Sequence, residues 1–182
     1  HHGLFDLAYL RSVPGMVVAS PRDERALRDL LYTASLYEGP MAVRYPRGSG
    51  VGAPADQPMN KIEIGRAELL HEGSDIVVIS TGPIAAEVSK AIKKLETLDV
   101  SAAHVDMTFV KPLDEDMLRC MARKGVPVVT VEDGTVVGGL GSAVGDWLQS
   151  HGYTGIPLLK VGIPDMFVTQ GTVDQLRKLC GM

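Results

Sequence analysis

The stretch DIVVISTGPIAAEVSKAIKKLETLDVSAAHVDM, residues 75–107, decides the fold of this chain. It opens with a mostly apolar, strand-sized run over 75–81 and closes with a second one over 100–107. Strands that lack polar alternation are typical of parallel sheets covered on both faces. Between them, residues 83–98 carry apolar side chains along one helical stripe: Ile84, Val88, Ala91, Ile92 and Leu95. The stretch therefore predicts a strand, a helix and a parallel strand, joined by the right-handed crossover that this unit prefers.

The same alternation extends toward the C-terminus and one strand further toward the N-terminus. The elements predicted there are an edge strand at 62–70, a helix from its cap Asp114 to about 124, strands at 127–132 and 157–161, and helices at 140–150 and 172–180. Strands that alternate with helices in this way indicate an α/β fold. We therefore predict a doubly wound, mostly parallel sheet over residues 62–182.

The first part of the chain is a shorter α/β unit. It is predicted to contain a helix from Leu4, a strand at 16–19, a helix at 21–37 capped by Ser20, and a strand at 41–45. Glycine, proline and other small residues without periodicity follow, so we predict a linker at 48–61 between units at 1–47 and 62–182. The first unit is too short to form a doubly wound domain by itself. We therefore expect the chain to be part of a longer protein.

The composition argues against several classes of protein. With 45% hydrophobic and 22% charged residues, the chain has enough apolar material for an ordinary core. The net charge is −4 and no basic stripe is visible, so we expect no nucleic-acid partner. The apolar runs are far shorter than the roughly 20 residues of a membrane helix, so we expect no membrane span. The two cysteines form no C-x-x-C pair, and we expect a cytoplasmic protein.

Arg44 and Arg47 form the most suggestive pair of polar residues. They flank Tyr45-Pro46 at the predicted carboxyl end of a strand, directly before Gly48. Ligands of open α/β sheets bind at that end of the strands, and a guanidinium group matches phosphate oxygens. The pattern predicts a phosphate clamp. The alternative, which spacing leaves open, is that one or both arginines pair with carboxylates at a domain boundary.

The glycine-rich segment Gly138-Gly139-Leu140-Gly141 lies between a predicted strand and a predicted helix, as a dinucleotide-binding loop would. However, Val144 stands where that fingerprint requires a small residue. A tight turn into the helix, permitted by glycine, is the simpler interpretation. Glu132 and Asp133, at the end of the preceding strand, are a candidate acid pair, although solvated or helix-capping roles fit them better.

Other polar residues support no specific chemistry. His104 lies on an apolar strand, where we expect a packed imidazole. Ser142 is not in a G-x-S-x-G elbow, and the histidines lack the spacing of a zinc helix, so we predict no metal ligands. His1 precedes a predicted helix, so it could face a site where the helix N-terminus favours an anion. The alternative is that His1 and His2 are the remnant of a purification tag.

Several segments, taken in order, resemble one family, the 1-deoxy-D-xylulose-5-phosphate synthases of the transketolase superfamily. They begin with His1-His2-Gly3-Leu4-Phe5-Asp6-Leu7 and Arg44-Tyr45-Pro46-Arg47-Gly48, and continue with Phe109-Val110-Lys111-Pro112-Leu113-Asp114, Val131-Glu132-Asp133-Gly134, Gly138-Gly139-Leu140-Gly141 and Gly162-Ile163-Pro164-Asp165. Each motif alone is weak, but the ordered set runs along essentially the whole chain. The resemblance implies that residues 1–47 end a pyrimidine-binding domain and that 62–182 form a transketolase C-terminal domain.

The resemblance also implies a function and site residues. The family uses thiamine diphosphate and Mg²⁺ to condense pyruvate with D-glyceraldehyde 3-phosphate, releasing CO₂. His1 resembles the family's active-site histidine, and Arg47 resembles its substrate-phosphate arginine, with Arg44 beside it. The residues that hold the cofactor and the metal lie mostly upstream of His1. We therefore expect the isolated chain to be inactive and to need the N-terminal part of the same protein. The resemblance to this superfamily also implies a homodimer.

Two other interpretations remain open from the sequence. One is a split transketolase-like subunit that associates with a separate N-terminal partner. The other, from a different functional class, is a non-catalytic module that binds a small ligand or mediates dimerisation. Substitution of Arg47 would discriminate between a catalytic and a non-catalytic role.

Overall fold

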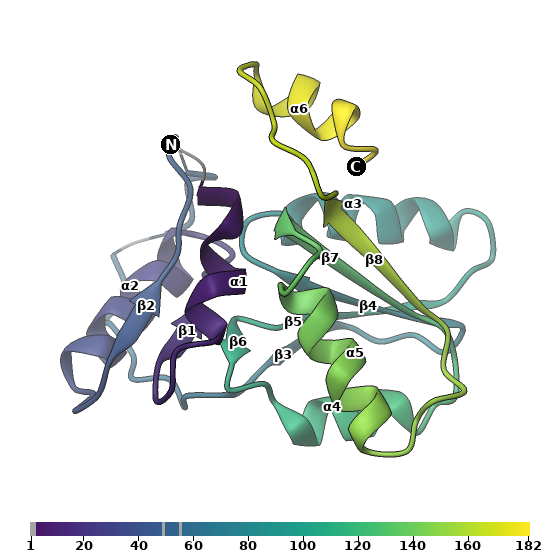
Figure 1. Cartoon of the computed structure of the whole chain (residues 1–182), viewed down its shortest axis with the longest axis horizontal. Helices are drawn as coiled ribbons and strands as arrows, with labels where there is room; N and C mark the ends of the chain where they lie inside the picture. Colours follow the sequence, from purple (N-terminus) through teal and green to yellow (C-terminus); the bar gives the residue numbers. More distant parts are fainter. Residues whose placement is uncertain (1–2, 49, 55) are drawn as a thin grey trace.

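The computed structural model describes residues 3–48, 50–54 and 56–182. They form two α/β layers, each a sheet with the helices packed on it, which lie side by side (Figure 1). The larger layer is a five-stranded sheet with the order β3-β5-β4-β7-β8. Its strands are β3 (Glu68–His71), β4 (Ile76–Thr81), β5 (Ala102–Asp106), β7 (Val128–Thr135) and β8 (Leu158–Ile163). All neighbours are parallel except the edge strand β3, which runs antiparallel to β5. The predicted mostly parallel sheet is confirmed, but the edge strand predicted at 62–70 is the shorter β3, which begins only at Glu68.

Helices cover both faces of this sheet. α3 (Ala85–Glu96) packs on one face, where Val78 of β4 contacts its apolar stripe. α4 (Glu115–Ala122) and α5 (Leu140–Ser150) pack on the other, where Val77 and Ile79 point. Successive strand residues alternate between the two faces, so one apolar strand serves both clusters. The doubly wound arrangement predicted from residues 75–107 is therefore confirmed.

The smaller layer contains the first unit. Its three-stranded sheet has the order β2-β1-β6, with β1 (Val17–Ala19), β2 (Met41–Val43) and β6 (Phe109–Lys111). α2 (Glu24–Ser35) packs on it through Leu30. A short 3₁₀ turn η1 (Gly3–Phe5) and α1 (Asp6–Arg11) precede β1, and Leu7 of α1 enters the large core cluster.

β6 was not expected from the sequence. It belongs to the chain after the linker, yet it pairs antiparallel with β1, aligning Val18 with Lys111 and Ala19 with Phe109. The amide of Ser20 also donates to the carbonyl oxygen of Thr108 at 2.8 Å. A three-residue strand is too short to show a periodicity, so only its pairing partner reveals it. The two units consequently share a sheet.

The start predicted for the second helix was wrong. α2 begins at Glu24, and its cap is Asp23, whose carboxylate accepts from the amide of Ala26 at 2.8 Å. Ser20 is not the cap, because its hydroxyl donates to the carbonyl oxygen of Arg44 at 3.0 Å. By contrast, the predicted cap Asp114 does accept from the amide of Met117 at the start of α4.

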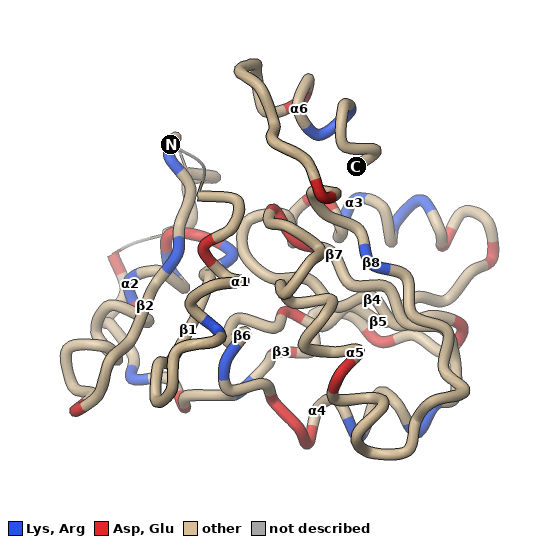
Figure 2. Tube along the Cα trace, in the orientation of Figure 1, with Lys and Arg blue, Asp and Glu red and all other residues tan. Residues whose placement is uncertain are grey.

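The last helix, α6 (Val173–Leu179), lies apart from both layers above the sheet (Figure 1) and has no buried residue. Acidic and basic positions are interspersed over both layers (Figure 2). None of the helices in the described ranges is long and apolar enough to cross a membrane.

Candidate functional site

Two segments of the first unit meet the second unit at the carboxyl end of β7. One is α1, whose Arg11 donates through Nη1 to the carbonyl oxygens of Gly138 and Gly139, the latter at 2.9 Å. The other is the segment after β2, where Arg44 donates through Nη2 to the carbonyl oxygen of Asp133 at 2.6 Å. The carboxyl ends of parallel strands are where such folds build their sites. The candidate site is therefore at this junction.

Arg44 is fixed at both its backbone and its side chain. Its amide donates to the carbonyl oxygen of Ala19 at 2.8 Å, which extends the pairing of β2 with β1. Its own carbonyl oxygen accepts from Ser20, and its guanidinium reaches across the junction to Asp133. One guanidinium group can serve a carbonyl and still offer other N–H donors, since it carries five. Arg44 is thus partly committed to the domain junction.

Arg47 lies in different surroundings. It is exposed, and it makes no hydrogen bond or ion pair with any residue in the described ranges. Neither Arg44 nor Arg47 pairs with a carboxylate there, so the alternative of a simple boundary ion pair finds no support. The phosphate clamp of both residues stays a prediction, in which Arg47 has the free guanidinium group.

Asp133 connects this junction to the C-terminal helix. Its two carboxylate oxygens accept from Arg177 of α6, at 3.3 Å from Nε and 2.7 Å from Nη2. This is the two-pronged geometry that a guanidinium forms with a carboxylate. Asp133 therefore contacts Arg44 through its backbone and α6 through its side chain, and it does not form an acid pair with Glu132.

Glu132 has a helix-capping role, as the sequence favoured, but it is buried and not solvated. Only 1% of its surface is exposed, and its carboxylate accepts from the amides of Leu140 and Gly141 at 2.8 and 2.9 Å. Burial raises the pKa of Glu132, while the two amides and the charges of Arg11 and Arg44 oppose that rise. The partial positive charge at the start of α5 is therefore met by the chain's own carboxylate.

This arrangement explains the glycine-rich segment. A Cβ atom on Gly139 would lie 2.1 Å from Oε2 of Glu132 and 2.4 Å from the carbonyl oxygen of Thr135. Glycine is required because the Glu132 carboxylate occupies the space where a side chain would stand. In a dinucleotide-binding loop the ligand's diphosphate takes the helix N-terminus, which here is filled. The tight turn is the correct interpretation.

Two further sequence predictions can be checked. His104 is 1% exposed, and its ring nitrogens lie 2.8 Å from the hydroxyl of Ser80 and 3.3 Å from that of Ser89. The predicted packed imidazole is therefore confirmed. Ser142 donates to the carbonyl oxygen of Val136 and accepts from the amide of Gly138, so it stabilises the turn. His1, the predicted active-site histidine, lies outside the described residues.

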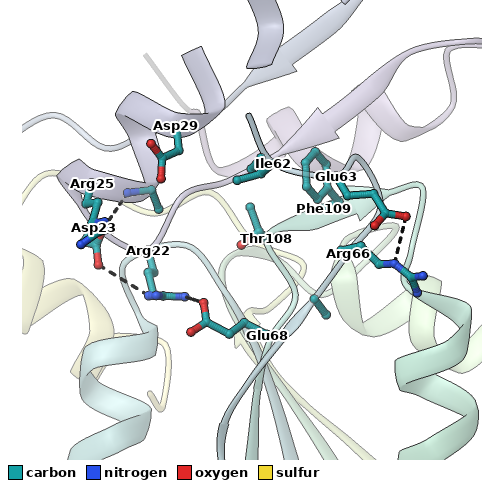
Figure 3. Close-up of a pocket in the computed structure, with 12 residues that line it drawn as sticks. Arg22, Asp23, Arg25, Asp29, Ile62, Glu63, Arg66, Glu68, Thr108 and Phe109 are labelled. Carbon is teal, nitrogen blue, oxygen red and sulfur yellow. Dashed lines mark hydrogen bonds and ion pairs between the residues drawn. The ribbon is translucent and has the colours of Figure 1, made fainter. Parts of the chain in front are cut away.

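A separate cavity of about 460 Å³ opens between α2 and the start of the second unit (Figure 3). Its charged side chains are largely paired with one another. Arg22 contacts Asp23 and Glu68, and Arg66 contacts Glu63 (Figure 3). Arg22 also reaches the buried Asp106 at 3.0 Å. Arg22 thus connects the two units through Glu68 and Asp106, and most charges that line the cavity are paired, while Arg25 also lines it and makes no ion pair in the described ranges.

Sequence reasoning missed the residues that build the junction: Arg11, Arg22, Lys111 and Arg177. Each is a single basic residue near an element end, and no local pattern marks its distant partner. The described part of the chain contains no group of three His, Cys, Asp or Glu side chains able to hold a metal ion.

Comparisons with known proteins point to the same family as the ordered sequence motifs. The transketolase C-terminal domain matches residues 65–182, and the transketolase pyrimidine-binding domain matches residues 1–51. The 1-deoxy-D-xylulose-5-phosphate synthases of Parabacteroides distasonis and Bacteroides thetaiotaomicron are 46% and 48% identical to the whole chain. The chain spans only 29% and 28% of their respective lengths.

A solved structure described as a split gene transketolase, inactive beta4 tetramer, also resembles the chain. It is 34% identical and superposes with a TM-score of 0.85, over 98% of this chain and 57% of that one. The resemblance predicted from the ordered motifs is confirmed, as is the predicted fold class. From its C-terminal domain, its partial pyrimidine-binding domain and its full-length similarity to these synthases, the chain belongs to the transketolase family.

Proposed function

We propose that this chain is the C-terminal part of a thiamine-diphosphate-dependent synthase. The enzyme would condense pyruvate with D-glyceraldehyde 3-phosphate to 1-deoxy-D-xylulose 5-phosphate and CO₂. The observation that carries the proposal is 43 to 48% identity over the entire chain to synthases of that name from several bacteria. Such identity over the whole chain, across the junction as well as both units, favours a shared reaction.

The surroundings of Arg47 support a role in binding the substrate phosphate. Its guanidinium is exposed and free of partners in the described ranges, and it follows the carboxyl end of β2. Arg44, three residues earlier, is held by Ser20 and Asp133 and fixes the start of this loop. A planar guanidinium suits the oxygens of a phosphate ester better than a lysine ammonium would. His1 would act on the reacting oxygens, as the family resemblance implies.

The described residues do not supply a complete cofactor site. A magnesium ion with a diphosphate needs oxygen ligands in octahedral geometry, and the described ranges contain no suitable acidic cluster. The buried Glu132 is already saturated by two amides at the start of α5. Thiamine diphosphate would supply the carbanion chemistry when bound, and we assign its binding and that of Mg²⁺ mostly to residues outside this chain.

These considerations define the expected partners. The chain would need the N-terminal part of the same protein to become active, and a homodimer is the assembly that we propose for the complete enzyme. The relatives are more than three times as long as this chain, which supports such a missing part.

The test uses the complete protein that carries this chain. With pyruvate, glyceraldehyde 3-phosphate, thiamine diphosphate and Mg²⁺, it should form 1-deoxy-D-xylulose 5-phosphate. Arg47→Ala should raise the KM for glyceraldehyde 3-phosphate by roughly 10- to 100-fold, the value of a hydrogen-bonded charge pair, and leave the KM for pyruvate nearly unchanged. Arg25→Ala, which alters an exposed arginine of α2, is the matched control. Unchanged kinetics for Arg47→Ala would exclude Arg47 from binding the phosphate, and a complete protein that forms no product would support the non-catalytic module.

A second candidate is a split subunit of the same enzyme class. It is favoured by the similarity to the split gene transketolase, of which this chain covers 57%. The two candidates differ in a mixing experiment. If the 182-residue chain gains activity when a separately expressed N-terminal part is added, a split enzyme is supported. If activity requires one continuous polypeptide, the first candidate stands.

A further inference from the structure

The C-terminal end of helix α1 is held by hydrogen bonds to the second unit. Its last residue, Arg11, donates to the carbonyl oxygens of Gly138 and Gly139. In the opposite sense, Lys111 of β6 donates through Nζ to the carbonyl oxygens of Arg11 and Val13 at 3.0 and 2.6 Å. The last carbonyls of a helix lack partners within the helix, and a lysine is a favourable partner for them. Each unit thus contributes one cationic side chain that donates to backbone carbonyls of the other unit.

Close packing accompanies these contacts. Leu7 is 2% exposed in the large core cluster. Gly138 has a positive φ of 76°, and a Cβ atom there would lie 3.3 Å from the Cβ of Ala8. Gly134 faces the carbonyl oxygen of Leu4, at 3.4 Å from its notional Cβ. Segment 3–11 therefore lies directly against the turn that joins β7 to α5.

The end of β7, which leads into this turn, contacts the other predicted site segment. Arg44 donates to the carbonyl oxygen of Asp133, five residues before the turn carbonyl at Gly138. Glu132 fixes the turn internally, through the amides of Leu140 and Gly141. The end of β7 and the turn after it therefore contact both α1 and the segment that contains Arg44 and Arg47.

We propose that Arg11 is a positioning residue for the condensation reaction, holding α1 and the chain segment that leads into it on the 138–139 turn. This inference rests on the proposed function. Arg11 would act through the turn, because both hydrogen bonds of its Nη1 go to backbone carbonyls of that turn. A displacement of about 1 Å far from the reacting atoms can cost on the order of 100-fold in rate. The role would therefore appear in kcat and hardly in the binding of glyceraldehyde 3-phosphate.

The test compares three variants of the complete enzyme. Arg11→Met keeps much of the side-chain volume and removes both hydrogen bonds, and it should lower kcat on the order of 10- to 100-fold with less than about a threefold change in KM. Arg11→Lys can still reach one of the carbonyls and should recover part of the lost kcat. Arg25→Met is the matched control, since Arg25 is exposed and makes no hydrogen bond or ion pair in the described ranges, and it should behave as wild type.

Other outcomes of the same experiment would overturn the inference. An unchanged kcat in a folded Arg11→Met protein would overturn the inference, as would equal losses in the Met and Lys variants or a loss confined to KM. If Arg11→Met fails to fold, Lys111→Gln is the second variant. It weakens the contact of β6 with the C-terminal end of α1, and it should lower kcat with KM preserved. The proposed function is judged separately, by product formation in the wild type and by Arg47→Ala, so either idea can fail alone.

Discussion

His104 is an ionisable residue held in the sheet interior by neutral partners. It lies on β5, between the edge strand β3 and the central strand β4, and its ring nitrogens lie within hydrogen-bond distance of the hydroxyls of Ser80 and Ser89. Burial is the largest cause that lowers the pKa of His104 to about 4, and the charges of His71 and Arg22 act in the same direction. Hydroxyl groups can adapt to a neutral ring but cannot compensate a buried cation. The folded protein therefore keeps this imidazole neutral.

This environment predicts a dependence of stability on pH. Below pH 6.5 the unfolded chain takes up a proton on His104, while the folded chain does so only near pH 4, so folding stability falls as the pH drops through that window. The gap is equivalent to about 3 kcal/mol. The difference in the free energy of unfolding between the wild type and His104→Gln should therefore mostly disappear as the pH falls from 7 to 4. Urea unfolding followed by Trp147 fluorescence measures this difference. A difference that stays constant over this range would contradict the assignment. The control is the exposed His151→Gln, followed by far-UV circular dichroism because His151 stacks on Trp147.

Arginines show most clearly what the sequence could and could not predict at this scale. Arg44 and Arg47 were identified because they flank a proline at a strand end, a local pattern. Arg11 and Arg22 have no such pattern, yet each contacts residues more than 40 positions away, on the turn at Gly138 and on Asp106. Partners so distant are set by how the units dock, which the spacing of residues along the chain does not encode.

At the scale of elements, α5 depends on its first turn. The helix begins over Glu132, and Gly139 leaves room for that carboxylate. Its other end carries Trp147, which is 6% exposed and stacks on His151 and Tyr153. The apolar stripes of α3 and α5 predicted both helices to within two residues. The start of α2 could not be placed as well, because Ser20, Pro21 and Asp23 are all suitable near a helix start and only the pairing of Ser20 with Arg44 decides between them.

Gly139→Ala tests the element directly. The new methyl group would lie 2.1 Å from the Glu132 carboxylate and 2.4 Å from a backbone oxygen, so the carboxylate must leave the amides of α5. We expect a loss of roughly 2 to 4 kcal/mol in the free energy of unfolding, from overpacking and from the buried carboxylate that loses its donors. Urea unfolding followed by Trp147 fluorescence measures it. Gly155→Ala is the matched control, since nothing lies within 4 Å of its notional Cβ, and equal stability of the two variants would refute the account.

At the scale of the whole molecule, the two units are joined more closely than the predicted linker suggests. They are connected by the pairing of β1 with β6, by the hydrogen bonds of Lys111 to the end of α1, and by the ion pairs of Arg22 with Glu68 and Asp106. The boundaries at 48–61 stay a prediction, since composition marks the linker but says nothing about how much surface the flanking units bury against each other. The parallel sheet itself was predictable because its strands and helices are local patterns.

Arg22 is the ion-pair partner on which this junction depends most. Asp106 is fully buried, its Oδ2 accepts from Arg22 and Thr108, and its Oδ1 has no hydrogen-bond partner in the described ranges. Burial is the largest cause that raises the pKa of Asp106 to about 6, and Arg22 opposes that rise. A raised carboxyl pKa means that the stability it contributes is present below pH 3.8 and is lost as the pH rises through 6. Arg22 limits this loss at neutral pH.

Arg22→Met should therefore destabilise the chain much more at pH 8 than at pH 5. At pH 8 the variant leaves an ionised Asp106 buried without its countercharge, which costs about 3 to 5 kcal/mol. At pH 5 the carboxyl is mostly protonated, so the variant loses a hydrogen bond to a neutral group and the partly exposed contacts with Asp23 and Glu68, each worth about 1 kcal/mol or less. Urea unfolding at the two pH values measures the difference, with Arg25→Met as the control. Equal destabilisation at both would show that Arg22 acts through packing alone, because only a charge on Asp106 can make the cost of losing Arg22 depend on pH in this direction.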